Sequence, residues 1–149
     1  MKTDLLELIG LAIENERQVA SYYRAMADLL PEHKATWDLL SHQEEGHATA
    51  LMRVREAVEC RPLLFSPGRY KVVTVRKMIR DISTMIDDIR GRAVSPQYTL
   101  TFASDVEQAL LESGLDEIVT TTVPEVLETL RWLKEQTTSH RDLLRGVAL

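Results

Sequence analysis

The sequence predicts an all-α fold in which one domain forms a bundle of helices. Along five segments, apolar residues recur in steps of three and four, which places them on one face of a helix. Only 6 Gly and 5 Pro interrupt the 149 residues, and the prolines fall between these segments or at their starts. A chain of this length buries one hydrophobic core and is too short for two ordinary domains.

The first two segments predict a helical hairpin over residues 3–59. Thr3 or Asp4 can cap the first helix, which continues without a helix breaker to about Leu29. Pro31 then interrupts the apolar pattern, and a second helix follows over about 32–59 with the same spacing. Each of the two helices has one narrow apolar face, as expected of neighbours in a bundle.

Residues 60–95 form a predicted connection that contains an additional helix. Two prolines and the Pro67-Gly68 turn signal end the second helix. A third amphipathic helix follows over 72–89, and its apolar face has no side chain of a metal-ligand type, so we interpret it as a packing element. A four-helix bundle needs only four apolar helix faces, and this helix adds a fifth. The sequence therefore predicts a homodimer, in which a second copy of the chain covers the additional face.

A second hairpin is predicted over residues 96–146. Ser95 and Pro96 are typical of a helix start, and the fourth helix is expected to reach about Thr120. The last helix begins near Pro124 and continues toward the C-terminus. His47 in the first hairpin and His140 in the second each follow a proline by 16 residues. Two related hairpins joined by a long connection are a standard route to a four-helix bundle.

Five polar side chains interrupt the apolar faces and are the candidate metal ligands. An ionised carboxylate buried without a partner opposes folding by several kcal/mol, so a compensating group is expected. Residues three apart on a helix point the same way, which lets a Glu-x-x-His motif reach one ion. Carboxylates combined with imidazoles suit iron, manganese or zinc. We expect one or two ions to be held by Glu16, Glu44, His47, Glu107 and His140.

This arrangement resembles the rubrerythrin and ferritin-like family of di-iron carboxylate proteins. The likeness rests on residues 12–16 with Tyr23, on the Glu-Glu-Gly-His motif at 44–47, and on Ser95-Pro96 with the second-half glutamate and histidine. The resemblance implies a ferritin-like four-helix bundle whose long crossover connection contains the additional helix. It also implies iron as the cofactor, a small-molecule oxidant as the partner, and oxidase, peroxidase or iron-handling activity. The ligands that it implies are Glu16, Glu44, His47, Glu107 and His140.

The second half departs from the family pattern. Thr137 stands where the second Glu-x-x-His motif needs its glutamate, so the second metal position lacks a carboxylate. Gly114 replaces the counterpart of Tyr23, and Leu110 replaces a glutamate expected of rubrerythrin peroxidases. The only cysteine, Cys60, excludes a four-cysteine rubredoxin module. These departures favour an alternative: a non-catalytic helical bundle that has lost the metal site and acts as an interaction or regulatory module. No catalytic residue is assigned.

Composition excludes other classes of partner. The net charge of −5 argues against nucleic acid, because proteins that bind it concentrate Lys and Arg to neutralise phosphates. No apolar run approaches the roughly 18 residues that a membrane span needs, and no signal segment is recognisable. We therefore expect a cytoplasmic protein that binds neither nucleic acid nor membrane.

Overall fold

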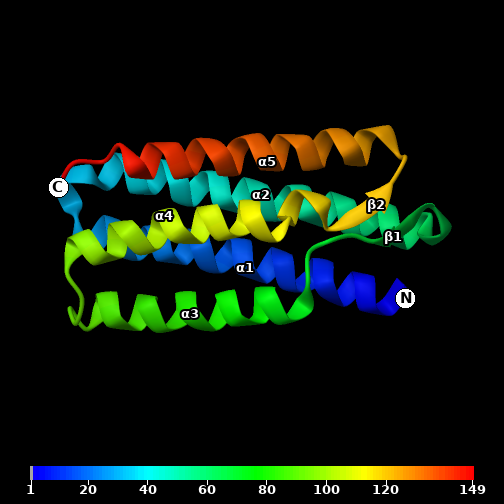
Figure 1. The fold of residues 1–149 in the computed structure, drawn as a ribbon. Helices are drawn as coiled ribbons and strands as arrows, with labels where there is room; N and C mark the ends of the chain where they lie inside the picture. The colour runs from blue at the N-terminus through cyan, green and yellow to red at the C-terminus, as the bar shows by residue number, and fades with distance from the viewer. Residues whose placement is uncertain (1) are drawn as a thin grey trace.

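A computed structural model shows a mostly helical protein, as the sequence predicts (Figure 1). The structure describes the backbone of residues 2–149 and the side chains of residues 4–149. This part of the chain forms five α-helices, two short β-strands and three 3-10 turns. The helices are α1 (Lys2–Leu29), α2 (Lys34–Cys60), α3 (Val72–Arg90), α4 (Pro96–Ser113) and α5 (Pro124–Arg145). The strands are β1 (Phe65–Pro67) and β2 (Val119–Thr121), and the 3-10 turns are Pro31–His33, Pro62–Leu64 and Leu115–Glu117.

The helices lie along a common direction (Figure 1). α1 and α2 run antiparallel and contact each other along their length, and α4 and α5 form a second antiparallel hairpin. α3 lies beside α1 and runs in the same direction, so that it carries the chain back to the end where α2 began. As a result α4 runs in the same direction as α2, and contacts between α2 and α5 join the two hairpins.

Local sequence explains where several helices begin. The Ser95 hydroxyl accepts a hydrogen bond from the Tyr98 N–H at 3.2 Å, and Pro96 occupies the first turn of α4, as predicted. Pro124 opens α5 in the same way. The predicted cap of α1 is wrong at Asp4, because the helix already begins at Lys2 and Asp4 lies inside its first turn. The side chain of Thr3, the other predicted cap, lies outside the described side chains.

The fourth helix is shorter than the sequence predicts, since α4 ends at Ser113 and not near Thr120. Gly114 adopts a left-handed conformation with φ of 87°, which closes the helix with a hydrogen bond from its N–H to the Leu110 carbonyl. A 3-10 turn follows, and then β2. The apolar periodicity of the sequence continues to Leu115 and Ile118. Both residues are buried, although they lie after the end of α4.

The two strands form a small antiparallel pair that the sequence analysis did not predict. Phe65 of β1 lies opposite Thr121 of β2, and Pro67 lies opposite Val119. The strands tie the connection after α2 to the segment before α5, at the end of the molecule where α1 begins (Figure 1). The run of β-branched residues over 118–123 favours extended structure and was the available signal.

Substitution of Gly68 by alanine should destabilise the protein. The Gly68 N–H donates to the Ile118 carbonyl at 3.1 Å, and a Cβ at this position would lie only 1.7 Å from the Glu117 carbonyl oxygen. With alanine at position 68, the backbone there would therefore have to move away from the segment that contains Glu117 and Ile118. We expect a loss of about 2–3 kcal/mol in the free energy of unfolding, measured by urea denaturation. Gly10→Ala is the matched control: a Cβ there meets nothing within 4 Å, so this change should be neutral or stabilising. Equal stability of both variants would contradict the steric account.

A single core occupies the space between the helices, with Trp37, Tyr23 and Leu40 among its fully buried side chains. The apolar face of α3, including Val75 and Ile82, is buried in the same core, and α3 packs mainly on α1. The apolar face of α3 is therefore covered within one chain. It no longer gives a reason to expect a homodimer, which stays a prediction. Within residues 2–149, no helix combines the length and the apolar character needed to cross a membrane.

Candidate metal centre

The five predicted ligands come from four helices and are all buried. Glu16 lies in α1, Glu44 and His47 lie one turn apart in α2, Glu107 lies in α4 and His140 lies in α5. Each has a relative exposure of 2% or less. The apolar residues around them orient the helices, and the three-residue and four-residue spacing then directs the polar side chains inward. All five side chains are thus buried in the interior, from four different helices.

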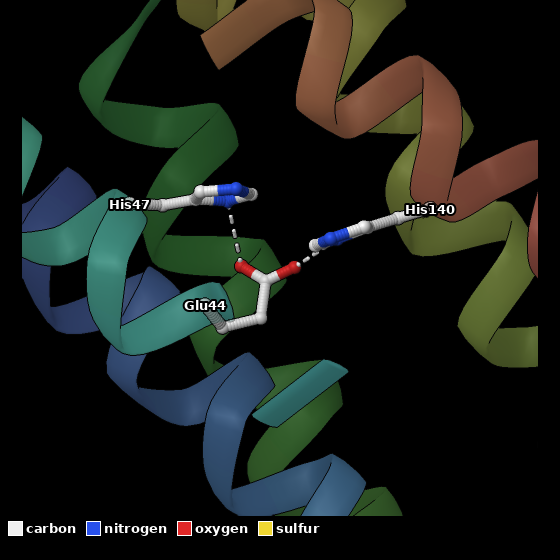
Figure 2. A group of neighbouring side chains, drawn as sticks. All are labelled: Glu44, His47 and His140. Carbon is white, nitrogen blue, oxygen red and sulfur yellow. Dashed lines mark hydrogen bonds and ion pairs between the residues drawn. The ribbon is translucent and has the colours of Figure 1, made fainter. Parts of the chain in front are cut away.

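Glu44 lies at the centre of the cluster and faces both histidines (Figure 2). Its Oε1 is 2.8 Å from the Nδ1 atom of His140, and its Oε2 is 3.2 Å from the Nδ1 atom of His47. The two imidazole rings are stacked, with centroids 5.0 Å apart and an interplanar angle of 19°. One oxygen and two nitrogens, one from each of these residues, lie within 4.8 Å of one another, close enough to hold a metal ion.

The other two carboxylates approach the same histidines. An oxygen of Glu16 is 4.0 Å from Nδ1 of His47, and an oxygen of Glu107 is 3.5 Å from Nδ1 of His140. Each imidazole therefore has Glu44 on one side and a second carboxylate nearby. Three acidic groups share a volume closed to water, which is unfavourable when all of them are ionised.

Many polar atoms of the cluster have no hydrogen-bond partner among the described residues. They are both oxygens of Glu16, one oxygen each of Glu44 and Glu107, and both ring nitrogens of His47. Buried polar groups in native proteins are nearly always satisfied, and each exception costs about 1–3 kcal/mol. A bound divalent cation would supply the partner that these oxygens and nitrogens lack. The donor set therefore fits a metal ion.

The cluster perturbs the pKa values of its members. Burial, together with the nearby charges of Glu44 and Glu107, raises the pKa of Glu16 well above its usual range. Burial and the charge of Glu44 also raise the pKa of Glu107 to about 7. For Glu44 burial opposes ionisation, but its contacts with Glu16 and the two histidines outweigh burial and lower its pKa well below the usual value.

His140 is the second ionised member of the cluster. Burial lowers its pKa, but its contacts with Glu107 and Glu44 have the larger effect and raise the pKa to about 10. Without metal, the cluster therefore pairs an ionised Glu44 with a protonated His140, while the raised pKa of Glu16 favours its protonated form. A cation that binds here would have to displace protons from this cluster.

Gln43, which no sequence pattern indicated, contacts the outer side of His140. The Nε2 atom of His140 lies 2.8 Å from Oε1 of Gln43, while its Nδ1 atom faces Glu44. Histidines that bind metals commonly donate their second ring N–H to an acceptor of this kind, which fixes the tautomer and the ring orientation. Gln43 precedes Glu44 in α2 and is only half-buried, so the apolar spacing gave no signal for it.

Tyr23, one of the residues that carry the family resemblance, packs in the core and also makes a polar contact. Its ring stacks on Trp37, with centroids 6.2 Å apart and an interplanar angle of 13°. Its hydroxyl donates a hydrogen bond to Oε1 of Glu107 at 2.7 Å. Tyr23 therefore leaves the other Glu107 oxygen free to bind a cation.

Thr137 does not replace the missing glutamate. The residue is buried, and its hydroxyl donates to the Leu133 carbonyl of the preceding helical turn at 2.8 Å. Its neighbours Glu135 and Gln136 are exposed and half-buried, respectively, and the hydrogen bonds of the cluster do not include them. The site thus has three carboxylates and two imidazoles.

Comparisons of the chain with protein-family models, with curated proteins and with solved structures found no match.

Proposed function

We propose that this protein is a ferritin-like, rubrerythrin-type metalloprotein that binds one transition-metal ion between Glu44, His47 and His140, and that this ion is iron, as the family resemblance implies. The observation that carries the proposal is the set of buried oxygens and nitrogens without hydrogen-bond partners at the centre of four helices. Glu16 and Glu107 complete the acidic surroundings of the ion. Manganese and zinc suit the same donors, since affinity alone does not select among these metals.

The direction of the helices supports the ferritin-like part of the proposal. Two antiparallel hairpins are connected by α3, which returns along the bundle so that α2 and α4 run the same way (Figure 1). This is the order expected of a four-helix bundle with one long crossover connection. In this interpretation α3 is the additional helix of that connection, and the four helices with site residues are the bundle itself.

The residues around the proposed ion would have different roles. Glu44 presents one oxygen toward each imidazole, so it would hold an ion together with the two histidines. Gln43 orients His140, and Tyr23 positions Glu107. The surrounding core excludes bulk water, which strengthens each of these electrostatic contacts. A bound iron ion would supply one-electron redox chemistry toward a small oxidant, and Thr137 leaves one side of the cluster without a carboxylate.

Metal analysis of the Glu44→Ala variant tests the proposal. Wild-type protein purified without chelator should contain about one transition-metal ion per chain, and the variant should contain almost none, because the residue that contacts both histidines is lost. Glu45→Ala is the matched control: the neighbouring carboxylate forms a half-exposed ion pair with Arg24 at 3.4 Å. Sub-stoichiometric metal that is unchanged in Glu44→Ala would defeat the proposal.

Metal binding should release protons and should tighten as the pH rises. The pKa of Glu16 is raised well above its usual range, that of Glu107 is about 7 and that of His140 is about 10, so a cation has to compete with protons for these groups. Protons compete with the metal below these pKa values, and the competition weakens above them. Calorimetric titration with Zn²⁺ in two buffers of different ionisation enthalpy should show proton release and higher affinity at about pH 8 than at about pH 6. A pH-independent affinity without proton release would contradict this charge state.

The alternative is the non-catalytic helical bundle. Thr137 favours it, because its hydroxyl is bonded to its own helix and offers the cluster no charge. In this case the buried glutamates would be neutralised by protons alone. The apolar face of α3, which such a module would need to expose as an interaction surface, is buried mainly against α1. The metal analysis above separates the two functions, since the alternative predicts no bound ion in either protein.

A further inference from the structure

A groove of about 640 Å³ lies between α2 and α5. Its lining includes Gly46, Ala50 and Arg53 from α2 together with Glu128 and Trp132 from α5. The proposed metal ligands are not part of this lining. The groove therefore belongs to the outer face of the two helices and not to the metal centre.

Exposed apolar side chains continue this face beyond the groove. Leu39 precedes Gly46 by seven residues, and Leu143 follows Trp132 by eleven. These intervals are about two and about three helical turns, so both leucines share the faces that line the groove. Leu39 is 51% exposed, Leu143 is 43% exposed and Trp132 is 40% exposed. The groove and the two leucines form what we call the α2–α5 surface, and exposed apolar residues gathered in this way indicate an interaction site.

No neighbour within the chain requires the glycine at position 46. The residue is exposed and lies in the middle of α2, where glycine is less favourable for a helix than alanine. A Cβ at this position would meet nothing within 4 Å. Gly46 and Ala50 are one helical turn apart, so together they leave a depression in the face of α2. A bulky side chain from another molecule would fit there.

Trp132 is a bulky side chain that is already held in place. Its indole ring contacts the ring of His47 edge to face, with centroids 5.4 Å apart. The contact with this buried residue orders the indole before any partner binds. Ordered tryptophan side chains at the centre of an interface commonly contribute much of the binding energy.

Arg53 and Glu128 place opposite charges on the two edges of the groove. Arg53 belongs to the α2 edge and Glu128 to the α5 edge, and both are exposed. Among residues 4–149, neither side chain has a hydrogen-bond or ion-pair partner. A partner that matches these charges presents an acidic group to α2 and a basic group to α5.

The α2–α5 surface has these complementary features at matching heights. The two helices run in opposite directions, and the contacts of His140 with Gln43 and of Trp132 with His47 fix their alignment. Counting along the helices from these contacts places three pairs at about the same level. They are Leu39 with Leu143, Ala50 with Trp132 and Arg53 with Glu128. Each pair thus joins two apolar residues, a small and a bulky residue, or a basic and an acidic residue.

We propose that the α2–α5 surface is the interface of a homodimer whose two-fold axis runs along the groove. In this arrangement α2 of one copy faces α5 of its partner, so Trp132 enters the partner's depression at Gly46 and Ala50. Arg53 faces the partner's Glu128, and Leu39 faces the partner's Leu143. Every contact occurs twice, which is the self-complementarity that a two-fold interface requires. The interface differs from the one expected from the sequence, because the apolar face of α3 is buried.

Sedimentation velocity of the wild type and of two charge reversals tests the proposal. The wild type should be a dimer at micromolar concentration. Arg53→Glu brings two acidic groups together at both contacts, and Glu128→Arg brings two basic groups together. Each reversal should therefore raise the dissociation constant of the dimer at least about tenfold. Arg131→Glu is the matched control, since this exposed residue of α5 is not part of the groove, and it should not weaken the dimer.

Mixing the two reversed variants shows whether the charges meet between copies. In a mixed dimer the new carboxylate at position 53 faces the new guanidinium at position 128, and the unchanged Arg53 and Glu128 face each other as well. The mixture should therefore dimerise with an affinity close to that of the wild type. A monomeric wild type, an unchanged affinity in both reversed variants, or a mixture that restores no dimer would each overturn the proposal. These variants keep all proposed metal ligands, so the result does not depend on the metal analysis.

Discussion

Removal of bound metal should lower the midpoint of thermal unfolding by about 10 °C. A ligand that binds only the folded state at a thousandfold excess over its dissociation constant stabilises that state by about 4 kcal/mol. For a chain of this size, each kcal/mol corresponds to about 2–4 °C. The physical source is the set of buried atoms without hydrogen-bond partners in the cluster, including both oxygens of Glu16 and both ring nitrogens of His47, to which a bound ion would supply a partner.

Differential scanning calorimetry with and without a strong chelator measures this effect. The Glu44→Ala variant should show no dependence on the chelator, because it has no ion to lose, while Glu45→Ala should behave like the wild type. An identical melting temperature of the wild type under both conditions would favour the non-catalytic bundle.

The Thr137→Glu substitution should add a second metal position. Thr137 precedes His140 by three residues, as Glu44 precedes His47, so a glutamate there completes a second Glu-x-x-His motif on the inner face of α5. A fourth carboxylate balances the charge of two divalent ions. We expect the metal content to rise from about one to about two ions per chain.

The same variant should be less stable than the wild type when metal is absent. It buries another carboxylate in a cluster that already holds three, and an unpaired buried charge costs several kcal/mol or takes up a proton. Thr138→Glu is the matched control, since this neighbouring residue is only half-buried and its hydroxyl bonds to the Lys134 carbonyl outside the cluster. Unchanged metal content in Thr137→Glu, with the fold intact, would show that position 137 does not face the site.

The helical architecture could be predicted from the sequence because each helix has a periodic apolar face and a clear boundary. Pro96 and Pro124 begin α4 and α5 at the predicted residues. The end of α4 could not be predicted in the same way. The apolar spacing continues through Leu115 and Ile118, which are both buried. The left-handed conformation of Gly114 ends the helix before them, so they reach the core from the segment that follows α4.

The candidate site was also largely predictable, because a charged residue on an apolar face must find a partner inside the protein. This argument locates Glu16 and Glu107, yet it says nothing about residues beside the apolar face. Gln43 reaches His140 only because α2 and α5 are rotated so that this edge of α2 faces α5. Such rotations depend on how whole helices pack against each other. The spacing of residues along one helix carries no information about that packing.

Anomalous diffraction at the absorption edge of the bound metal is the most direct test of the central claim. In crystals of the protein grown with iron or zinc, the account predicts one strong peak among Glu44, His47 and His140, at about 2 Å from Nδ1 of each histidine. A peak only at surface carboxylates, or no peak with the five side chains held by water and protons alone, would contradict it.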